Sequence, residues 1–168
     1  MITDSFYVGA KGKPICQDYA KHYNNGLGVL SDGCSSGGET HLGAAMMVLR
    51  GPHSRITADD LGLTFNDMVA THVRIEETEY SIHGDGTVLI KYLDGSQKII
   101  NVHFSQNAPD YPAYRLYGLT DQYLQMFKGQ EKLITTIVND QPPTYSFGKP
   151  FESVYEELEN VKYVMAFS

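Results

Sequence analysis

The sequence predicts an α+β domain built on antiparallel β-sheet, with helices on its flanks. Three observations favour this class. The expected elements run in the order strands, helices and again strands. Asn-Gly and Asp-Gly dipeptides separate several alternating segments, as they do in hairpins of adjacent strands. No repeat, low-complexity tract or linker divides the 168 residues, so we expect one domain over residues 1–168.

Composition and charge disfavour several classes of function. The hydrophobic content of 42% is enough for a core, and the formal net charge of -7 disfavours binding to nucleic acid or anionic membranes. The two cysteines, Cys16 and Cys34, form no disulfide framework. No segment approaches the ~20 apolar residues of a membrane span, and no apolar run of signal length opens the sequence. We therefore expect a reduced, cytoplasmic protein, and its oligomeric state is left open.

The first elements are expected to be strands. Residues 5–10 alternate weakly and predict a short strand. Asn25-Gly26 is a strong signal for a two-residue hairpin turn. This turn would join a strand within residues 16–23 to a strand within residues 27–33, antiparallel and adjacent.

Two helices are expected next. Residues 34–38, "CSSGG", form a loop, and residues 39–50 have helix-forming composition with Glu39 in the first turn. Residues 56–73 predict a second helix, with Thr57 as its N-cap.

The pattern then changes from helical to alternating. Residues 72–86, 87–95 and 96–105 predict three successive strands, separated by the turns "HGDG" and "LDGS". Asp-Gly turns of this kind join neighbouring antiparallel strands, so these segments predict a meander.

The remaining sequence gives weaker signals. Residues 106–116 predict a loop with two prolines, and residues 141–151 predict an irregular segment. Residues 120–140 are expected to begin as a helix and finish as a strand. Residues 152–161 predict a short helix, and residues 162–168 a buried strand.

The predicted hairpin brings two carboxylates together. Asp18 on the outgoing strand and Asp32 on the returning strand lie about equally far from the turn, so both fall at one end of the hairpin. Two adjacent carboxylates repel, and a hard divalent cation such as Mg²⁺ or Mn²⁺ removes the conflict. Gly33 lacks a Cβ, so its carbonyl can approach an ion. The loop 34–38 and the helix start after it favour an anion such as phosphate. An Asp32-Gly33 pair that forms a turn and nothing more is the alternative.

Four segments in this order resemble the metal-dependent protein phosphatases of type 2C. They are "KPICQDYA", "GVLSDGCSSGGETHLGAAMM", "SIHGDGTVLIKYLDGS" and the terminal "VMAFS". The matching family motifs are Gln17-Asp18 preceded by the basic Lys13, the strand-Asp-Gly-loop-helix segment 30–43, the hairpin Gly84-Asp85-Gly86, and the strand before a final Ser. The resemblance implies a type-2C-like antiparallel β-sandwich flanked by helices.

The resemblance also implies an activity and its site residues. Family members hold two Mg²⁺ or Mn²⁺ ions and hydrolyse phosphoserine or phosphothreonine in proteins by a metal-bridged hydroxide. Asp32 would bridge both ions, the Gly33 carbonyl would bind one, and Asp18 would bind directly or through water. Lys13 would steady the phosphate as a point charge, where the family more often has Arg.

Two departures from the family leave alternatives open. Cys34 stands where some members have a proton-donating histidine. The family's remaining metal-binding aspartates would follow Ser168, so we expect that the C-terminal part of the family domain is absent, and that this chain binds metal weakly and is nearly inactive. An inactive pseudophosphatase that binds a phosphopeptide or protein, and a purely structural domain, are the alternatives. Asp85 is expected mainly to shape its hairpin turn, and the six histidines show no zinc-site spacing.

Overall fold

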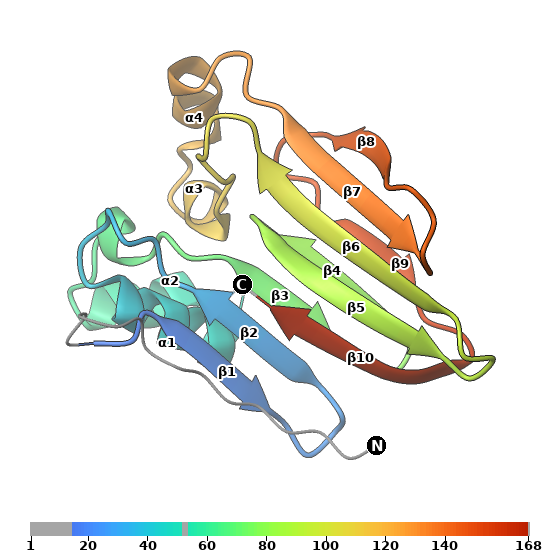
Figure 1. Cartoon of the computed structure of the whole chain (residues 1–168). Helices are drawn as coiled ribbons and strands as arrows, with labels where there is room; N and C mark the ends of the chain where they lie inside the picture. The colour runs from blue at the N-terminus through green and yellow to red at the C-terminus, as the bar shows by residue number, and fades with distance from the viewer. Residues whose placement is uncertain (1–14, 52–53, 168) are drawn as a thin grey trace.

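The computed structural model describes residues 15–51 and 54–167, and its strands form two five-stranded antiparallel sheets. The expected strand 5–10 lies outside the described residues. In the first sheet the strands follow the order β1 (Asp18–His22), β2 (Gly28–Asp32), β3 (His72–Ile75), β4 (Glu79–His83) and β9 (Val154–Glu157). In the second the order is β10 (Val161–Phe167), β5 (Gly86–Tyr92), β6 (Gln97–Phe104), β7 (Lys132–Val138) and β8 (Thr144–Gly148). The predicted α+β class with antiparallel sheets is confirmed (Figure 1).

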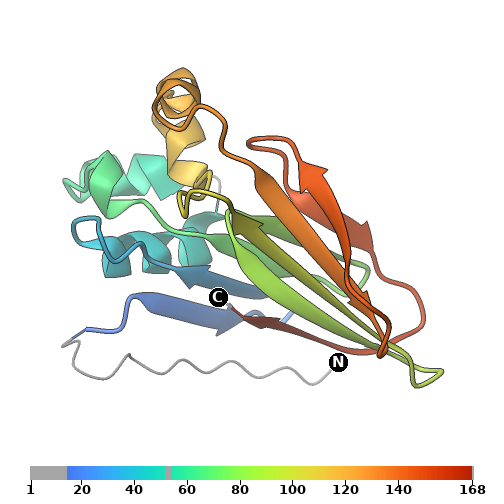
Figure 2. The ribbon, with the colours of Figure 1, turned by 45° about the horizontal axis from the view of Figure 1, so that its top comes forward.

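The helices are few and short. They are α1 (Thr40–Arg50), α2 (Ser54–Asp60), α3 (Pro112–Leu116), α4 (Thr120–Met126) and the 3₁₀ helix η2 (Phe65–Asp67). Helices α1 and α2 lie beside the first sheet, and α3 and α4 lie where β6 ends and β7 begins (Figure 2). Among the described helices, none is long and apolar enough to cross a membrane.

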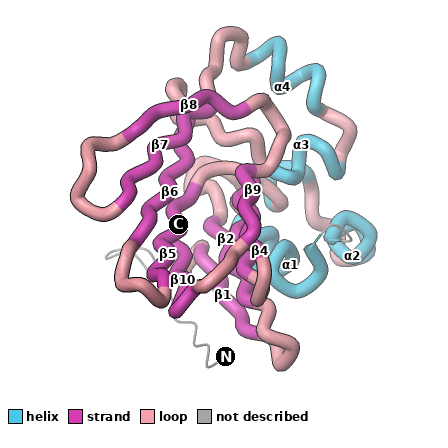
Figure 3. The backbone as a smooth tube through the Cα atoms, turned by 90° about the vertical axis from the view of Figure 1, so that its right-hand side faces the viewer, coloured by secondary structure: helices cyan, strands magenta, loops and turns pink. Residues whose placement is uncertain are grey.

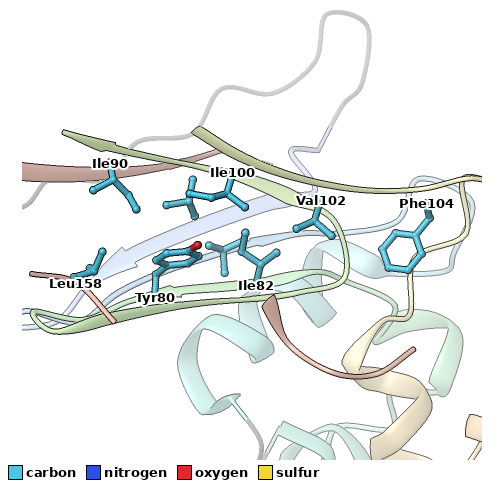
Figure 4. Packing of buried hydrophobic residues seen from close by; sticks show 9 residues of the cluster. Tyr80, Ile82, Ile90, Ile100, Val102, Phe104 and Leu158 are labelled. Atoms are coloured by element: carbon cyan, nitrogen blue, oxygen red, sulfur yellow. The ribbon is translucent and has the colours of Figure 1, made fainter. Parts of the chain in front are cut away.

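The two sheets share one hydrophobic core between their facing sides. Ile82 from β4 and Ile90 and Val102 from the second sheet are fully or almost fully buried in it, as Figure 4 shows. Because side chains alternate between the faces of a strand, the neighbours of these residues point away from the core. Burial of this apolar surface is the main force that holds the sheets together.

The predicted hairpin between β1 and β2 is confirmed, but its loop has three residues, 24–26, and not the predicted two, because Tyr23 N–H donates to the Leu27 carbonyl oxygen and His22 pairs with Gly28. Gly26 has φ +84, which suits glycine, and its N–H donates to the Tyr23 carbonyl oxygen at 3.0 Å. This turn fixes the register, in which Asp18 is the direct partner of Asp32. The predicted helix 39–50 is also confirmed, although α1 begins at Thr40.

The second helix prediction, residues 56–73, is largely wrong. Only α2 is an α-helix there, and Thr57 lies inside it and is not its N-cap. Gly62 takes φ +72, a left-handed conformation that ends the helical path. The chain then forms η2 and enters β3, because apolar residues here pack against α1 and no longer follow one helical stripe.

Further predictions need correction in the second half of the chain. The predicted single strand 72–86 is two strands, β3 and β4. The predicted loop 106–116 contains α3, and the segment 141–151, predicted to be irregular, contains β8. The predicted helix 152–161 is instead the edge strand β9. The prediction for residues 120–140 is confirmed by α4 and β7. The last segment forms strand β10, but this is an edge strand with half-exposed side chains and not a buried one.

A pair of histidines makes the fold sensitive to acid. His72 and His83 are direct partners on β3 and β4, with ring centroids 5.9 Å apart. Burial lowers the pKa of each to about 4; the neighbouring His83 and Arg74 add to the effect on His72, and Lys132 and Arg115 add to that on His83. The folded protein therefore keeps both rings neutral at a pH where an unfolded chain would protonate them.

We expect the free energy of unfolding to fall as the pH is lowered from about 6.5 to about 4. In that range the unfolded chain binds more protons than the folded one, so the stabilisation is complete above 6.5 and lost near 4. Because both rings are only partly buried, the expected loss is on the order of 2 kcal/mol. Urea unfolding at several pH values measures it. In the double variant His72→Gln/His83→Gln the free energy of unfolding should depend less on pH, whereas replacing the exposed His103 with Gln should leave the pH dependence unchanged. The same pH dependence in wild type and both variants would contradict the assignment to His72 and His83.

Candidate functional site

Asp18 and Asp32 meet at one end of the first sheet. They are direct Cα partners, so their side chains project from the same face of the β1–β2 pair. Leu30, two residues before Asp32, packs against the core between the sheets. Asp32 therefore points into the space between the sheets, at the end where β1 begins and β2 ends. The predicted juxtaposition of the two carboxylates is confirmed.

The strand end that presents Asp32 is held by several hydrogen bonds. The Asp32 N–H donates to Thr71 Oγ1 at 3.0 Å, and the Thr71 N–H donates to the Asp32 carbonyl oxygen at 2.9 Å. The buried Ser31 hydroxyl donates to the Thr71 carbonyl oxygen at 2.5 Å. These contacts join β2 to the start of β3 and fix the backbone from which the carboxylate projects.

The two aspartates line a cleft of about 500 Å³. Four segments far apart in the sequence form it: the start of β1, the end of β2 with the loop 33–36, the turn between β4 and β5, and the loop 107–111. Three of the lining side chains are carboxylates, because Asp85 joins Asp18 and Asp32. Such a cleft concentrates negative charge and attracts cations.

Asp85 lies in the hairpin turn, as expected, and also lines this cleft. Burial raises its pKa, and the negative Asp110 adds to this effect, while a hydrogen bond from the Asp85 backbone acts against it. Spacing alone did not place Asp85 beside the other two carboxylates. The signal that could have found it is the Gly84-Asp85-Gly86 turn, because β4 runs antiparallel to β3 and so ends where β2 ends.

The cleft is also lined by Tyr111, Cys34 and Ser36. Cys34 Sγ lies 3.1 Å from Ser36 Oγ. Burial acts to raise the pKa of the Cys34 thiol, but hydrogen bonds from Ser36 and Tyr111 outweigh it and lower the pKa. Burial raises the pKa of Tyr111, helped by its hydrogen bond with Cys34 and by the carboxylates of Asp85 and Asp32. Tyr111 is therefore a neutral phenol beside the acidic side chains.

Gly33 is required for a reason other than the one the sequence indicates. A Cβ at this position would lie 2.7 Å from the Thr40 carbonyl oxygen and 2.9 Å from the Gln17 carbonyl oxygen. Both contacts are with backbone atoms, which cannot move without shifting β1 or the start of α1. The absence of a side chain thus allows α1 to pack directly on the end of β2.

Gly33→Ala is expected to lower the free energy of unfolding by about 2–3 kcal/mol, because the added methyl group overpacks this contact. The matched control is Gly28→Ala at the other end of β2, where the nearest atom to a new Cβ is the Ile75 carbonyl oxygen at 4.0 Å. Urea unfolding of the two variants gives the comparison. If both variants have similar free energies of unfolding, the close approach of backbone atoms to Gly33 does not exclude a side chain there.

The start of α1 does not offer the phosphate site that the sequence suggests. Asp67 Oδ1 accepts a hydrogen bond from the Glu39 N–H at 2.7 Å, and Asp67 Oδ2 accepts one from the Thr64 N–H at 2.7 Å. These hydrogen bonds, from Thr64 first and Glu39 second, lower the pKa of Asp67. A carboxylate therefore already occupies this helix start and would repel a phosphate.

The complete ligand set expected for two metal ions is not assembled in the described structure. Within residues 15–51 and 54–167, no three His, Cys, Asp or Glu side chains form a group that could hold a metal ion. The Asp18–Asp32 pair and the adjacent Gly33 are in place. Lys13, the expected phosphate-binding residue, lies outside the described residues.

Comparison with protein-family models, with curated proteins and with solved structures gave no match.

Proposed function

We propose that the chain is a metal-dependent phosphatase domain of the type-2C kind, which hydrolyses phosphoserine or phosphothreonine in proteins. The observation that supports this best is the direct pairing of Asp18 with Asp32 on one face of a hairpin, inside a cleft. The fold agrees with it, because two antiparallel sheets with a cleft at one end are what the resemblance implies. The proposed metal is Mn²⁺ or Mg²⁺, and the proposed compartment is the cytoplasm.

The residues of the cleft fit a hard divalent cation. Asp18 and Asp32 supply carboxylate oxygens, and Gly33 supplies a neighbouring carbonyl, which are the ligand types that Mg²⁺ and Mn²⁺ prefer. Divalent ions of this kind supply two effects when bound: they lower the pKa of a coordinated water and offset charge on a phosphoryl group. Asp85 adds a third carboxylate to the lining of the cleft.

The protein's own groups then have distinct roles. Asp32, whose backbone is fixed by Thr71, would hold the cation, and Asp18 would share it from the paired strand. Tyr111, a neutral phenol next to these carboxylates, holds Cys34 in the cleft lining through its hydrogen bond. In the proposed reaction Cys34 and the serines of the loop shape the cleft wall, and none of them forms a covalent phosphoenzyme.

Phosphate release from a phosphoserine peptide tests the proposal. Wild-type protein with Mn²⁺ should release phosphate slowly, because its ligand set is incomplete. Chelation of the metal should stop this release, and Asp32→Asn should abolish it while the protein stays folded by circular dichroism. Hydrolysis that persists in Asp32→Asn would exclude this cleft as the site of the reaction.

A second candidate function is binding of a phosphopeptide without hydrolysis. It is favoured by the incomplete ligand set in the described residues and by Cys34 at the position where some family members have a proton-donating histidine. Fluorescence anisotropy with a labelled phosphoserine peptide separates the two functions. Binding that is lost on removal of the phosphate, with no phosphate release under any metal condition, supports the second function over the first.

A further inference from the structure

The second sheet has an outer face that is rich in aromatic and large apolar side chains. On its two edge strands these are Tyr145 and Phe147 of β8, and Tyr163, Met165 and Phe167 of β10. All five are 43–68% exposed. Paired residues of neighbouring strands share a face of the sheet, and the pairing through β5, β6 and β7 puts all five side chains on the same face. Their neighbours Val164 and Ala166 pack against the core on the other face.

The middle of this face holds an aliphatic row beside the polar Thr87, Asn101 and Thr135, and the described helices leave it open. Leu89 of β5 pairs with Ile99 of β6, which pairs with Ile137 of β7, so these aliphatic side chains share the outer face. Helices α1–α4 lie on the other side of the molecule or at the end of the sheets (Figures 1 and 3). An extended sheet normally has each apolar face covered.

The size of the exposed face matches that of a protein interface. With ~200 Å² of surface on a fully exposed large side chain, the five edge residues expose on the order of 500 Å². The aliphatic centre brings the face close to the ~800 Å² that each partner contributes to a standard interface. Tyr, Phe and Met are also the residue types enriched at such interfaces.

Charge favours a second copy of this chain as the occupant. The sequence carries a formal net charge of -7, so two copies repel over most of their surface. None of the outward-facing positions of β5–β8 and β10 is Asp or Glu, and the residues there with a fixed charge are Lys91 and the exposed Lys162 at the β-bulge of β10. A basic partner would find no carboxylate to bind on this face, whereas a second copy meets no repulsion from carboxylates within it.

We propose that the outer face of the second sheet is the interface of a homodimer in which two copies pack sheet against sheet. A two-fold axis parallel to the strands places β10 of one copy over β8 of the other. Phe167, which the strand pairing places level with Tyr145, then contacts Tyr145 of the second copy, with Met165 and Phe147 on either side of this contact, and the aliphatic centres face each other. Such an arrangement is isologous and closed, and the sheet twist sets the strands about 30° apart. The inference stands apart from the proposed activity, because the cleft lies at one end of the sheets and not on this face.

Sedimentation equilibrium and light scattering of the full chain test the proposal. Wild type should be a dimer at micromolar concentration, and Met165→Asp or Phe147→Asp should weaken dimerisation at least 100-fold. The matched control is Leu124→Asp on α4, which is 45% exposed against 43% for Met165 and should leave the dimer intact.

Each other outcome overturns the proposal. A wild-type protein that stays monomeric at about 100 μM assigns the face to a different occupant. A dimer that survives both substitutions on the face, or one that Leu124→Asp disrupts equally, places the contact elsewhere. Circular dichroism of each variant separates loss of the dimer from loss of the fold.

Discussion

Replacing Asp32 with asparagine is expected to weaken Mn²⁺ binding by more than 100-fold. Loss of a group that only orients a metal ligand already costs about 10–100-fold in affinity, so loss of a direct charged ligand should exceed this. The substitution keeps the shape of the side chain and the backbone hydrogen bonds to Thr71, so the strand end should remain in place. The effect therefore reports the charge at the cleft and not a change in fold.

Calorimetry with Mn²⁺ on a set of aspartate variants measures this effect. Asp18→Asn should lower the affinity by about tenfold, less than Asp32→Asn, if Asp18 binds partly through water. The control is Asp94→Asn in the exposed turn between β5 and β6, where Asp94 Oδ1 accepts hydrogen bonds from Ser96. Equal affinities for Asp32→Asn and Asp94→Asn would remove the basis of the proposed function.

The part of this site that sequence could predict depends on one local signal. Asn24-Asn25-Gly26 form the tip of the hairpin, and counting outward from this three-residue loop gives the register that pairs Asp18 with Asp32. The two strands are adjacent in sequence, so no long-range information is needed. The same locality explains why α1, with helix-forming residues and no competing strand pattern, was predicted correctly.

The prediction failed where a strand gains its partners from distant segments. Residues Val154–Glu157 are rich in glutamate and predict a helix, but they form the edge of the first sheet, where Glu156 pairs with Lys98 of the second sheet at 2.7 Å. The strand Thr144–Gly148 was missed because it is short and lies between Pro143 and Pro150, which indicate irregular structure. Tertiary pairing overrides local propensity in both segments.

The residues that line the cleft could likewise not all be predicted from the sequence. Asp85 and Tyr111 belong to segments that follow β4 and β6, and they reach the cleft only because those strands end beside β2. No spacing in the sequence encodes this arrangement, since it depends on the order of the strands in the sheets. The resemblance named the Gly84-Asp85-Gly86 motif, but the residues alone gave Asp85 only the role of a turn former.

Lys132→Met is expected to lower the free energy of unfolding by about 3–5 kcal/mol, because it removes one partner of a buried ion pair. Lys132 Nζ lies 2.7 Å from Asp110 Oδ2, and the two side chains are only 2% and 1% exposed. Lys132 Nζ also donates to the Glu152 carbonyl oxygen at 2.8 Å, and Asp110 Oδ2 accepts from the Phe151 N–H at 2.5 Å. Burial raises the pKa of Asp110 even with Lys132 beside it, so an unpaired Asp110 would be costly to keep ionised.

Lys98→Met provides a control with the same residue type at the same distance from its partner. Lys98 Nζ lies 2.7 Å from Glu156 Oε2, but the side chains are 24% and 32% exposed, so water can solvate the glutamate left behind. Its loss should cost about 1 kcal/mol or less. Urea unfolding of both variants therefore tests whether burial or distance sets the effect. The double variant Lys132→Met/Asp110→Leu should recover most of the stability, because it leaves no buried charge unpaired. If Lys132→Met costs no more than Lys98→Met, burial does not set the effect, and the loop 107–111 that forms one wall of the cleft must be held by other contacts.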